Sequence, residues 1–512
     1  MRKPNDIFLL TKIIATTGPA SESPEVLRKL INAGTRVFRI NFSHGSEEDH
    51  KRVYRNIRAV SKSMGVHTAV MGDLPGPKIR IGEVAGGGLN LNVGDRVLFS
   101  KEKLVCIPEG DGSFVFGTNY PDFVKEVKEG QRVLLDDGNV SMVCLLVDPR
   151  KGILCEVIEG GFITSHKGVN LPDTELTVPV LTDKDYRCID VAVDLGFDML
   201  ALSFVRAGED VRILKDRLSD LNARPRVSWA YKNHEHSYNL TAEEMQGFIP
   251  VISKIEKPQA IDNLEDILEE TDGVMIARGD LGVEMDLAEV AVHQKNIIRL
   301  CHSFNIPVIV ATQMLQSMID SPVPTRAEVS DVANAIFDGA DAVMLSGETA
   351  VGKWPVDSVA MMNRIARKTN KYIRSLGFDA IMKGQLRDIN VRRSAIAHGV
   401  RVMAKDVDAV LIVMWTHFGS EAVLLSQQRM TRPILAFSNR ERTLRQMSLL
   451  YGLHPAFMEL PESGSKFLNT LDHVLLDNGW AEKGEAVVIV LGEPIERIGI
   501  ANRVVVHYVG IW

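Results

Sequence analysis

The chain has 512 residues, of which 45% are hydrophobic and 24% charged, and its formal net charge is -7. This length suffices for two or three domains, each with its own core. The small net charge, spread along the chain, argues against nucleic acid and anionic membrane as partners. Five scattered cysteines without a CxxC pair, no apolar run of membrane-spanning length and no signal-peptide pattern favour a cytoplasmic protein.

Eight short apolar runs, mostly separated by helical patterns, follow one another in the first two thirds of the chain. Continuous apolar runs of this kind are typical of parallel strands covered on both faces. Eight such strands alternating with helices predict a (β/α)8 barrel, that is, a TIM barrel. The expected strands are 12–18, 37–44, 68–74, 199–205, 250–256, 273–280, 307–314 and 342–349.

Two further domains are expected from the remaining segments. About 95 residues separate the third and fourth strands, far more than the usual βα loop. Their alternating runs, broken by Gly and Asp, predict an inserted small-β domain. After a helical segment from about residue 356, strands at 407–415, 432–438, 485–492 and 503–510 predict an open α/β sheet. We therefore expect a barrel at 1–76 and 170–355, the insertion at 77–169 and a C-terminal α/β domain at 356–512.

A polar segment at 223–248, just before the fifth strand, contains His234 and His236. Two histidines without a third nearby ligand are weak evidence for a metal site. We interpret this segment as an exposed loop insertion and assign it no chemistry.

Polar side chains collect where seven of the eight expected strands end. In a barrel the C-terminal strand ends carry the chemistry, because their side chains face a shared mouth. A single serine there fits an ordinary strand-end hydrogen bond, but several charged side chains together require a polar ligand or a metal. The residues are Arg39, Asn41, Ser43, His44, Asp73, Ser203, Lys254, Glu256, Arg278, Asp280, Thr312, Gln313, Ser346 and Glu348.

Lys254 and Glu256 stand two apart in the run VISKIEKP, so they share one face of their strand. The alternative is an ion pair with a purely structural role. A hydrophobic pair at these two positions would usually stabilise the fold at least as much as an ion pair. Glu256 and Asp280 are hard oxygen donors on adjacent strands, and such a set suits Mg²⁺. Lys254 and Arg39 supply positive charge suited to a phosphate. Together they predict metal-assisted phosphoryl transfer.

A set of ordered motifs carries a family resemblance. They are FRINFSHG (38–45), GDLPGPKIR (72–80), KGVNLP (167–172), ISKIEKP (252–258), ARGDLGVE (277–284), ATQMLQSM (311–318) and PTRAEVSDVANAIFDGADAVMLSGETAVGKWP (324–355). In these motifs the chain resembles the pyruvate kinases along nearly its entire length. The resemblance implies phosphoryl transfer from phosphoenolpyruvate to ADP, giving pyruvate and ATP, and a homotetramer.

The resemblance also implies roles for individual residues. Lys254 stabilises the phosphoryl group in transit and Arg39 grips the phosphate. Glu256 and Asp280 hold Mg²⁺, for which Mn²⁺ is a possible substitute, while Gly279 and Thr312 surround the substrate carboxylate. The nucleotide-side residues are Asn41, His44, Arg80 and Lys167. The inserted domain, a small β-barrel, acts as a lid that excludes water.

The motifs depart from many relatives at the monovalent-cation site. In those relatives K⁺ lies near the equivalents of Asn41, Ser43 and Asp73 and near a Thr, and a Glu follows four positions after that Thr. In this chain Leu74 stands at the position of the Thr and Lys78 at the position of the Glu. The ammonium of Lys78 replaces the K⁺ charge in this hypothesis, so the activity is expected not to require K⁺.

The C-terminal domain departs from relatives that bind a sugar-phosphate activator. Its loop THFGSEA (416–422) lacks the cations that hold such a ligand, so activation by fructose 1,6-bisphosphate is not expected. Two other functions remain open at this point. They are another enzyme of the same fold acting on phosphoenolpyruvate or pyruvate enolate, and a non-catalytic regulatory homologue.

Overall fold

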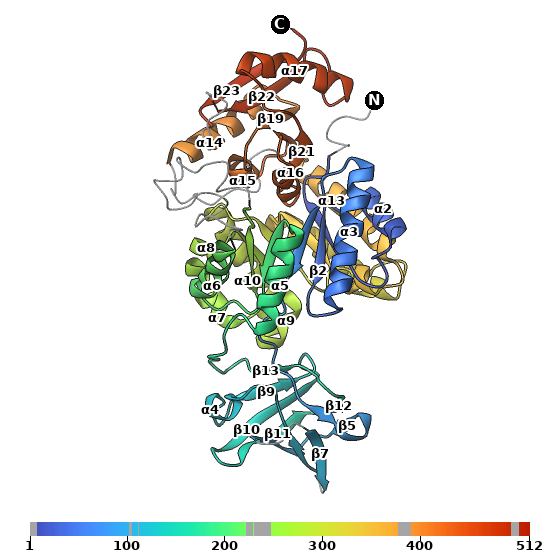
Figure 1. Cartoon of the computed structure of the whole chain (residues 1–512), viewed down its shortest axis with the longest axis vertical. Coiled ribbons are helices and arrows are strands. Elements are labelled where there is room, and N and C mark those ends of the chain that lie inside the picture. The colour runs from blue at the N-terminus through green and yellow to red at the C-terminus, as the bar shows by residue number, and fades with distance from the viewer. Residues whose placement is uncertain are drawn as a thin grey trace.

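The computed structural model describes residues 8–101, 105–110, 112–221, 229, 247–376, 391–492 and 501–511. Figure 1 shows three bodies along the long axis of the molecule. The C-terminal part lies at one end, the barrel lies in the middle, and a β-rich body formed by residues between the third and fourth barrel strands lies at the other end. No helix in these ranges is long and apolar enough to span a membrane.

The central body is a closed barrel of eight parallel strands, as predicted. The strands are β1 (Lys12–Thr16), β2 (Val37–Asn41), β3 (Ala69–Asp73), β14 (Met199–Leu202), β15 (Val251–Ile255), β16 (Gly273–Ala277), β17 (Val308–Ala311) and β18 (Ala342–Leu345). They are shorter than expected. The run expected as strand 273–280 ends at Ala277, because a short helix, α9 (Arg278–Glu284), begins at the next residue.

Helices surround the barrel, and their ends follow local sequence signals. Ser46 and Thr182 form capping boxes with Asp49 and Asp185 at the starts of two of them. Left-handed glycines, among them Gly65, end several of them. The helices are α2 (Pro24–Ala33), α3 (Glu47–Met64), α5 (Asp183–Leu195), α6 (Gly208–Asp220), α7 (Pro258–Asp262), α8 (Leu264–Glu270), α10 (Leu287–Ser303), α11 (Arg326–Asp338), α12 (Gly347–Ala350) and α13 (Pro355–Ser375), with the 3-10 turn η3 (Gln316–Ile319).

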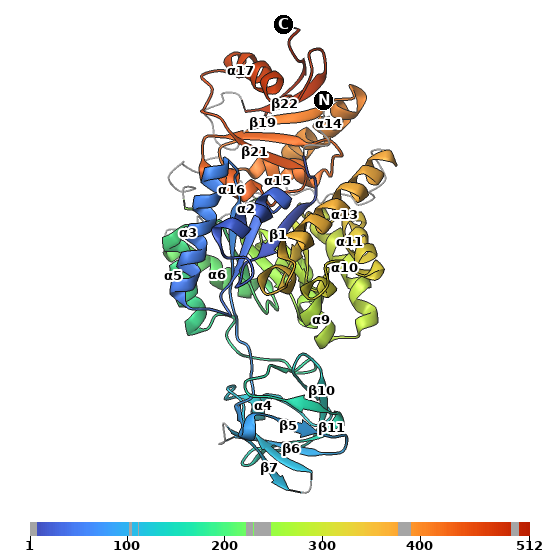
Figure 2. The same ribbon diagram turned by 90° about the vertical axis from the view of Figure 1, so that its right-hand side faces the viewer.

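The inserted body, here called the lid, is built almost entirely from strands. One sheet has the order β13-β9-β10-β11-β6-β8-β7-β4, and β12 pairs with β5 in a second. The strands are β4 (Glu83–Val84), β5 (Leu89–Leu91), β6 (Arg96–Ser100), β7 (Val105–Gly110), β8 (Ser113–Phe116), β9 (Arg132–Leu135), β10 (Val140–Asp148), β11 (Gly152–Glu159), β12 (Gly161–Ile163) and β13 (Val169–Asn170), with η1 (Ala85–Gly87) and α4 (Phe123–Glu126). The lid has its own apolar core around Phe99 and Phe116. Figure 2 shows that extended chain segments join it to the barrel.

The C-terminal part is an open five-stranded sheet of order β21-β20-β19-β22-β23, which confirms the predicted α/β domain. It contains α14 (Val391–Asp406), β19 (Leu411–Trp415), α15 (Ser420–Gln427), β20 (Ile434–Ser438), α16 (Glu441–Met447), β21 (Leu453–Phe457), α17 (Gly464–Asp477), β22 (Ala486–Leu491) and β23 (Arg503–Tyr508). The sequence did not predict β21, since its run LHPAF contains a proline and is only partly buried.

Salt bridges join this sheet domain to the barrel. Asp198, fully buried beside β14, pairs with Arg58 of α3 at 2.6 Å and with Arg445 of α16 at 2.8 Å. Asp341, just before β18, pairs with Arg429 at 3.2 Å. The segment with His234 and His236, expected as a loop insertion, lies outside the described residues apart from Trp229, Gly247 and Phe248.

Candidate active site

A buried ammonium lies at the centre of the barrel mouth, the end where the C-termini of the strands meet. Nζ of Lys254, on β15, lies 2.7 Å from Oε1 of Glu256 and 3.4 Å from Oδ1 of Asp73, which ends β3. It also donates to Oγ of Ser203 at 2.8 Å. The prediction that Lys254 and Glu256 share a face is therefore confirmed.

The charges of this cluster depend on one another. Burial raises the pKa of Glu256, and the nearby ammonium of Lys254 only partly offsets that effect. Burial opposes the charge of Lys254, but the carboxylates of Asp73 and Glu256 outweigh it and raise the pKa of the ammonium. Burial likewise opposes the charge of Asp73, but Lys254 and Arg39 hold its pKa below the ordinary value. The lysine therefore stays charged at neutral pH.

Arg39, on β2, extends the cluster towards the first strand. Its Nε donates to Oδ2 of Asp73 at 2.6 Å, and its Nη1 donates to Oγ1 of Thr16 at 3.1 Å. Two cations thus flank one buried carboxylate. Such an arrangement holds fixed positive charge at the mouth, as an anionic ligand requires.

Three residues from α9 and the end of β17 form the other side of the mouth. The amide of Gly279 donates to Oγ1 of Thr312 at 2.7 Å. Asp280, in the first turn of α9, is half-buried, and its charge acts on both Lys254 and Glu256. Thr312 has a φ of 67°, a conformation that strains a β-branched residue.

Glu256 and Asp280 are the carboxylates at the mouth that could hold a divalent metal, with water and ligand oxygens in its remaining positions. Oε1 of Glu256 faces Lys254, while Oε2 accepts from the amide of Phe204 at 2.8 Å, so the side chain is held in one orientation. Asp280 raises the pKa of Glu256 further, through repulsion that a divalent cation between the two would relieve. Among the described residues no group of three or more His, Cys, Asp or Glu side chains is placed to hold a metal.

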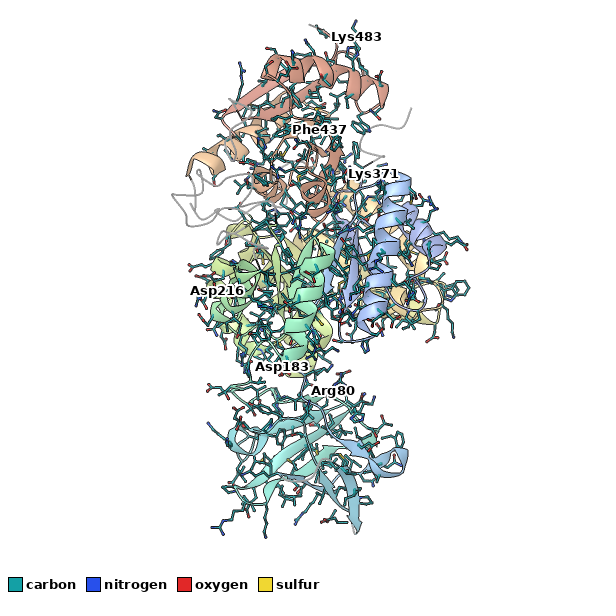
Figure 3. The ribbon with its side chains drawn as sticks, in the orientation of Figure 1. Arg80, Asp183, Asp216, Lys371, Phe437 and Lys483 are labelled. Atoms are coloured by element: carbon teal, nitrogen blue, oxygen red, sulfur yellow. The ribbon has the colours of Figure 1, made fainter. Side chains whose placement is uncertain are left out.

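Residues of the lid and of the barrel line a cavity of about 520 Å³. Its lining includes Ser43, Lys78, Arg80 and Lys184. Figure 3 shows Arg80 at the end of the lid that faces the barrel and Asp183, next to Lys184, at the end of the barrel that faces the lid. The cavity is thus rich in cations and has the size of a small-molecule site.

Of the predicted nucleotide-side residues, Arg80 lines this cavity. The amide of Ile81 donates to the carbonyl of Lys167 at 3.0 Å. This bond brings Arg80 and Lys167 together where the chain enters and leaves the lid, a region here called the lid hinge. Nη1 of Arg80 donates to the carbonyl of His166 at 2.7 Å, and Nζ of Lys167 lies 2.6 Å from Oδ1 of Asp136.

The two nucleotide-side residues from the barrel follow one another at the end of β2. Asn41 lies beside Asp73 in the β2–β3 register, and its Oδ1 accepts from the amide of Ser43 at 3.0 Å. Burial lowers the pKa of His44, as do the positive charges of Arg80, Lys184, Arg39 and Lys78. His44 therefore faces the same cations.

Comparison with known proteins decides the family. The model of the pyruvate kinase barrel domain matches residues 9–241 and 233–359, and that of the pyruvate kinase alpha/beta domain matches residues 394–507. The chain belongs to the pyruvate kinase family. It is 38% identical to a pyruvate kinase of Mycobacterium intracellulare over 98% of each chain, and 39% identical to one of Agrobacterium vitis, again over 98% of each. The crystal structure of a pyruvate kinase from Cryptosporidium parvum matches with a TM-score of 0.84 and 32% identity, covering 98% of this chain and 96% of that one.

Membership of the pyruvate kinase family makes the chain a phosphotransferase, and this family uses a divalent metal.

Leu74 stands at the position where many pyruvate kinases have Thr. It is 1% exposed, and its carbonyl accepts from Oγ of Ser203 at 2.7 Å. Lys78 is exposed at the lid hinge. Its Nζ lies beside Gly168, 4.0 Å from the position that a Cβ atom on this glycine would take. Across the described ranges Lys78 forms no ion pair with Asp73.

Other polar residues from the strand ends have local structural partners. Arg278 pairs with Asp331 at 2.7 Å. Both carboxylate oxygens of Glu348, fully buried, accept backbone amides, those of Leu315 and Ser346.

Two functional contacts were missed from the sequence. Thr16, which ends β1 and binds Arg39, was not considered. Ser203 belongs to the predicted set of polar strand-end residues, but the sequence does not predict its contact with Lys254 or that of Thr16 with Arg39. The signal for Thr16 was its place at the end of the first strand.

Proposed function

We propose that this chain transfers the phosphoryl group of phosphoenolpyruvate to ADP, giving pyruvate and ATP, with Mg²⁺ as the divalent metal and Mn²⁺ as a substitute. The observation that carries the proposal is the buried Lys254, held between Glu256 and Asp73 at the mouth of a pyruvate kinase barrel. A fixed cation at this point stabilises the charge of a phosphoryl group in transit.

Each mouth residue has one role in this proposal. Lys254 and Arg39 bind the phosphate of the donor. Glu256 and Asp280 hold the metal, which neutralises charge on substrate oxygens when it is bound. The amide of Gly279 and the hydroxyl of Thr312 position the substrate carboxylate. Their mutual hydrogen bond and the strained backbone of Thr312 support this role.

The nucleotide enters the cavity between barrel and lid in this proposal. Asn41 and His44 approach it from the barrel, while Arg80 and Lys167 approach it from the lid hinge. Closure of the lid carries the two hinge cations onto the phosphates and excludes water, which would otherwise hydrolyse the donor. The cations around the 520 Å³ cavity support this assignment.

We also propose that the chain divides into domains at 1–76 with 170–355, 77–169 and 356–512. The last barrel strand before the lid ends at Asp73, and the lid sheet ends with β13 at Val169–Asn170. A homotetrameric, cytoplasmic enzyme that does not require K⁺ completes the proposal. The tetramer rests on family resemblance alone.

The test is pyruvate formation from phosphoenolpyruvate and ADP with the purified chain. We expect turnover with Mg²⁺, turnover with Mn²⁺, and none after removal of divalent ions with a chelator. A chain that binds phosphoenolpyruvate but forms no pyruvate would refute the catalytic proposal. Full activity in the chelator would refute the metal assignment to Glu256 and Asp280.

A further inference from the structure

A second cavity lies at the opposite end of the barrel, against the C-terminal domain. Its volume is about 340 Å³, within the range of small-molecule sites. Phe248, just before β15, lines it from the barrel, while Phe418 and residues of α16 line it from the C-terminal domain. The cavity therefore lies between two domains, where ligand sites often occur.

Three guanidinium groups line this cavity: those of Arg440, Arg442 and Arg445. Arg445 is neutralised, because its Nε lies 2.8 Å from Oδ1 of the buried Asp198. Asp198 also serves Arg58, at 2.6 Å. One carboxylate is thus shared between two cations, and little negative charge remains for the other two arginines.

Arg442 and Arg440 lack an acidic partner in the parts of the chain that the structure describes. Nη2 of Arg442 donates to the carbonyl of Phe197 at 2.6 Å, but its buried Nε has no hydrogen-bond partner. The guanidinium of Arg440 lies over the ring of Phe418, 4.5 Å from its centroid. The acid among the described residues that line the cavity is Glu441, which is largely exposed and lies 3.3 Å from the ring of His67.

Burial without sufficient negative charge is unfavourable for these cations. It lowers the pKa of Arg440, and it lowers that of Arg442 even though Asp198 acts in the opposite direction. A bound anion would supply the missing partner, and a phosphate matches the fork of a guanidinium group. The two phenylalanine rings offer apolar surface to the remainder of such a ligand.

We propose that this cavity binds a phosphate monoester, with its phosphate on Arg440 and Arg442 and its organic part between Phe248 and Phe418. The cations come from α16 and the residue before it, whereas the loop at 416–422 contributes only the apolar ring of Phe418. Arg442 contacts the barrel through the carbonyl of Phe197, and Gln446 does so through the carbonyls of Asp198 and Phe248, at 3.0 and 2.7 Å. A ligand here would tie the C-terminal domain to the barrel.

The test uses phenyl phosphate as probe, since it combines a phosphate monoester with an apolar ring. Hydrogen–deuterium exchange of the full-length wild-type chain should show slower exchange in 440–447 with millimolar probe. The double variant Arg440→Gln/Arg442→Gln should lose this protection and weaken binding at least tenfold by calorimetry. The control Arg432→Gln, which changes an arginine paired with Asp408 on the same domain, should bind within twofold of wild type.

Absence of protection in 440–447, or protection that persists in the double variant, would overturn the proposal. If the double variant does not fold, the wild-type chain still decides the question. Phenyl phosphate should slow modification of Arg440 by phenylglyoxal at least fivefold, as mapped by mass spectrometry, and an unchanged rate would overturn the site. Neither measurement depends on pyruvate formation, so the result is independent of the proposed activity.

Discussion

The amide of Gly279 donates a 2.7 Å hydrogen bond to Oγ1 of Thr312, which joins the start of α9 to the end of β17. Oγ1 of Thr312 also donates to the carbonyl of Ala311 at 2.6 Å. A φ of 67° at a β-branched residue costs about 1–2 kcal/mol, so the surrounding structure must enforce it. A side chain at Gly279 would lie only 3.3 Å from Oγ1 of Thr312. The position of this hydroxyl is therefore tightly fixed.

Replacement of Thr312 by valine should reduce kcat/KM roughly 100-fold, because valine keeps the shape but has no hydroxyl for the substrate or for Gly279. Thr312→Ser keeps the hydroxyl and should stay within about tenfold of wild type. Steady-state kinetics with phosphoenolpyruvate varied would measure both. Equal losses in the two variants would show that the methyl group, and not the hydroxyl, is needed.

Lys254→Met should lower kcat roughly 1000-fold, because it removes the buried charge that stabilises the phosphoryl group in transit. The matched control is Lys257→Met on the same segment. Lys257 is also buried and lies 3.0 Å from Glu284, so both variants leave a carboxylate without its cation. We expect similar falls in thermal unfolding midpoint, but turnover within about tenfold of wild type for Lys257→Met. A Lys254→Met enzyme as active as this control would remove Lys254 from the mechanism.

The sequence predicted the barrel well because its signals are local. Apolar runs such as VISKI and VIVA become buried strands in any parallel sheet, and capping residues mark the helices between them. Strand ends were less predictable. The run GVMIARGD continues as apolar residues followed by polar ones, and nothing local shows that α9 begins at Arg278. The sequence missed β21 for a different reason, the proline in its partly buried run LHPAF.

The part of the site that lies on one strand could be predicted, because its signal is also local. The period of two along one strand placed Lys254 beside Glu256 without knowledge of the fold. Contacts between strands depend on register and on closure of the barrel. The contact of Thr16 with Arg39 joins β1 to β2, and that of Ser203 with Lys254 joins β14 to β15. No periodicity within one segment encodes such pairs.

Asp198 should make stability depend on pH. Burial opposes its charge, but Arg58 and Arg445 outweigh burial and lower its pKa. A carboxyl with a lower pKa in the folded state stabilises the fold above its unfolded pKa of about 3.9. It loses that contribution as the pH falls through the folded value. Asp198→Asn should therefore lower stability at pH 7 by roughly 3–5 kcal/mol and by less in acid.

Thermal unfolding of wild type and Asp198→Asn between neutral and acidic pH would measure this difference. The control is Asp408→Asn, because Asp408 forms a surface pair with Arg432 and is 88% exposed. A surface pair contributes at most about 1 kcal/mol, so this control should change little at any pH. A constant gap between wild type and Asp198→Asn across the pH range would contradict the linkage.

The proposed independence from K⁺ rests on the side chains at two positions after β3. Leu74 offers no side-chain oxygen to a cation, and Lys78 carries a fixed charge at the lid hinge. The charge of Lys78 lowers the pKa of His44, so it acts on the same part of the cleft. Closure of the lid brings this ammonium towards Asn41 and Asp73 in our hypothesis. Wild-type activity should then be equal in K⁺ and in tetramethylammonium at the same ionic strength.

The double variant Leu74→Thr/Lys78→Glu restores the residue types found in many K⁺-dependent relatives, and it should acquire a dependence on K⁺ of roughly tenfold or more. Lys151→Glu is the matched control, because it makes the same charge change at an exposed position of the lid. We expect this control to remain equally active in both salts. Strong stimulation of the wild type by K⁺ would contradict the role of Lys78. A double variant indifferent to K⁺ would show that these two positions alone do not create the cation site.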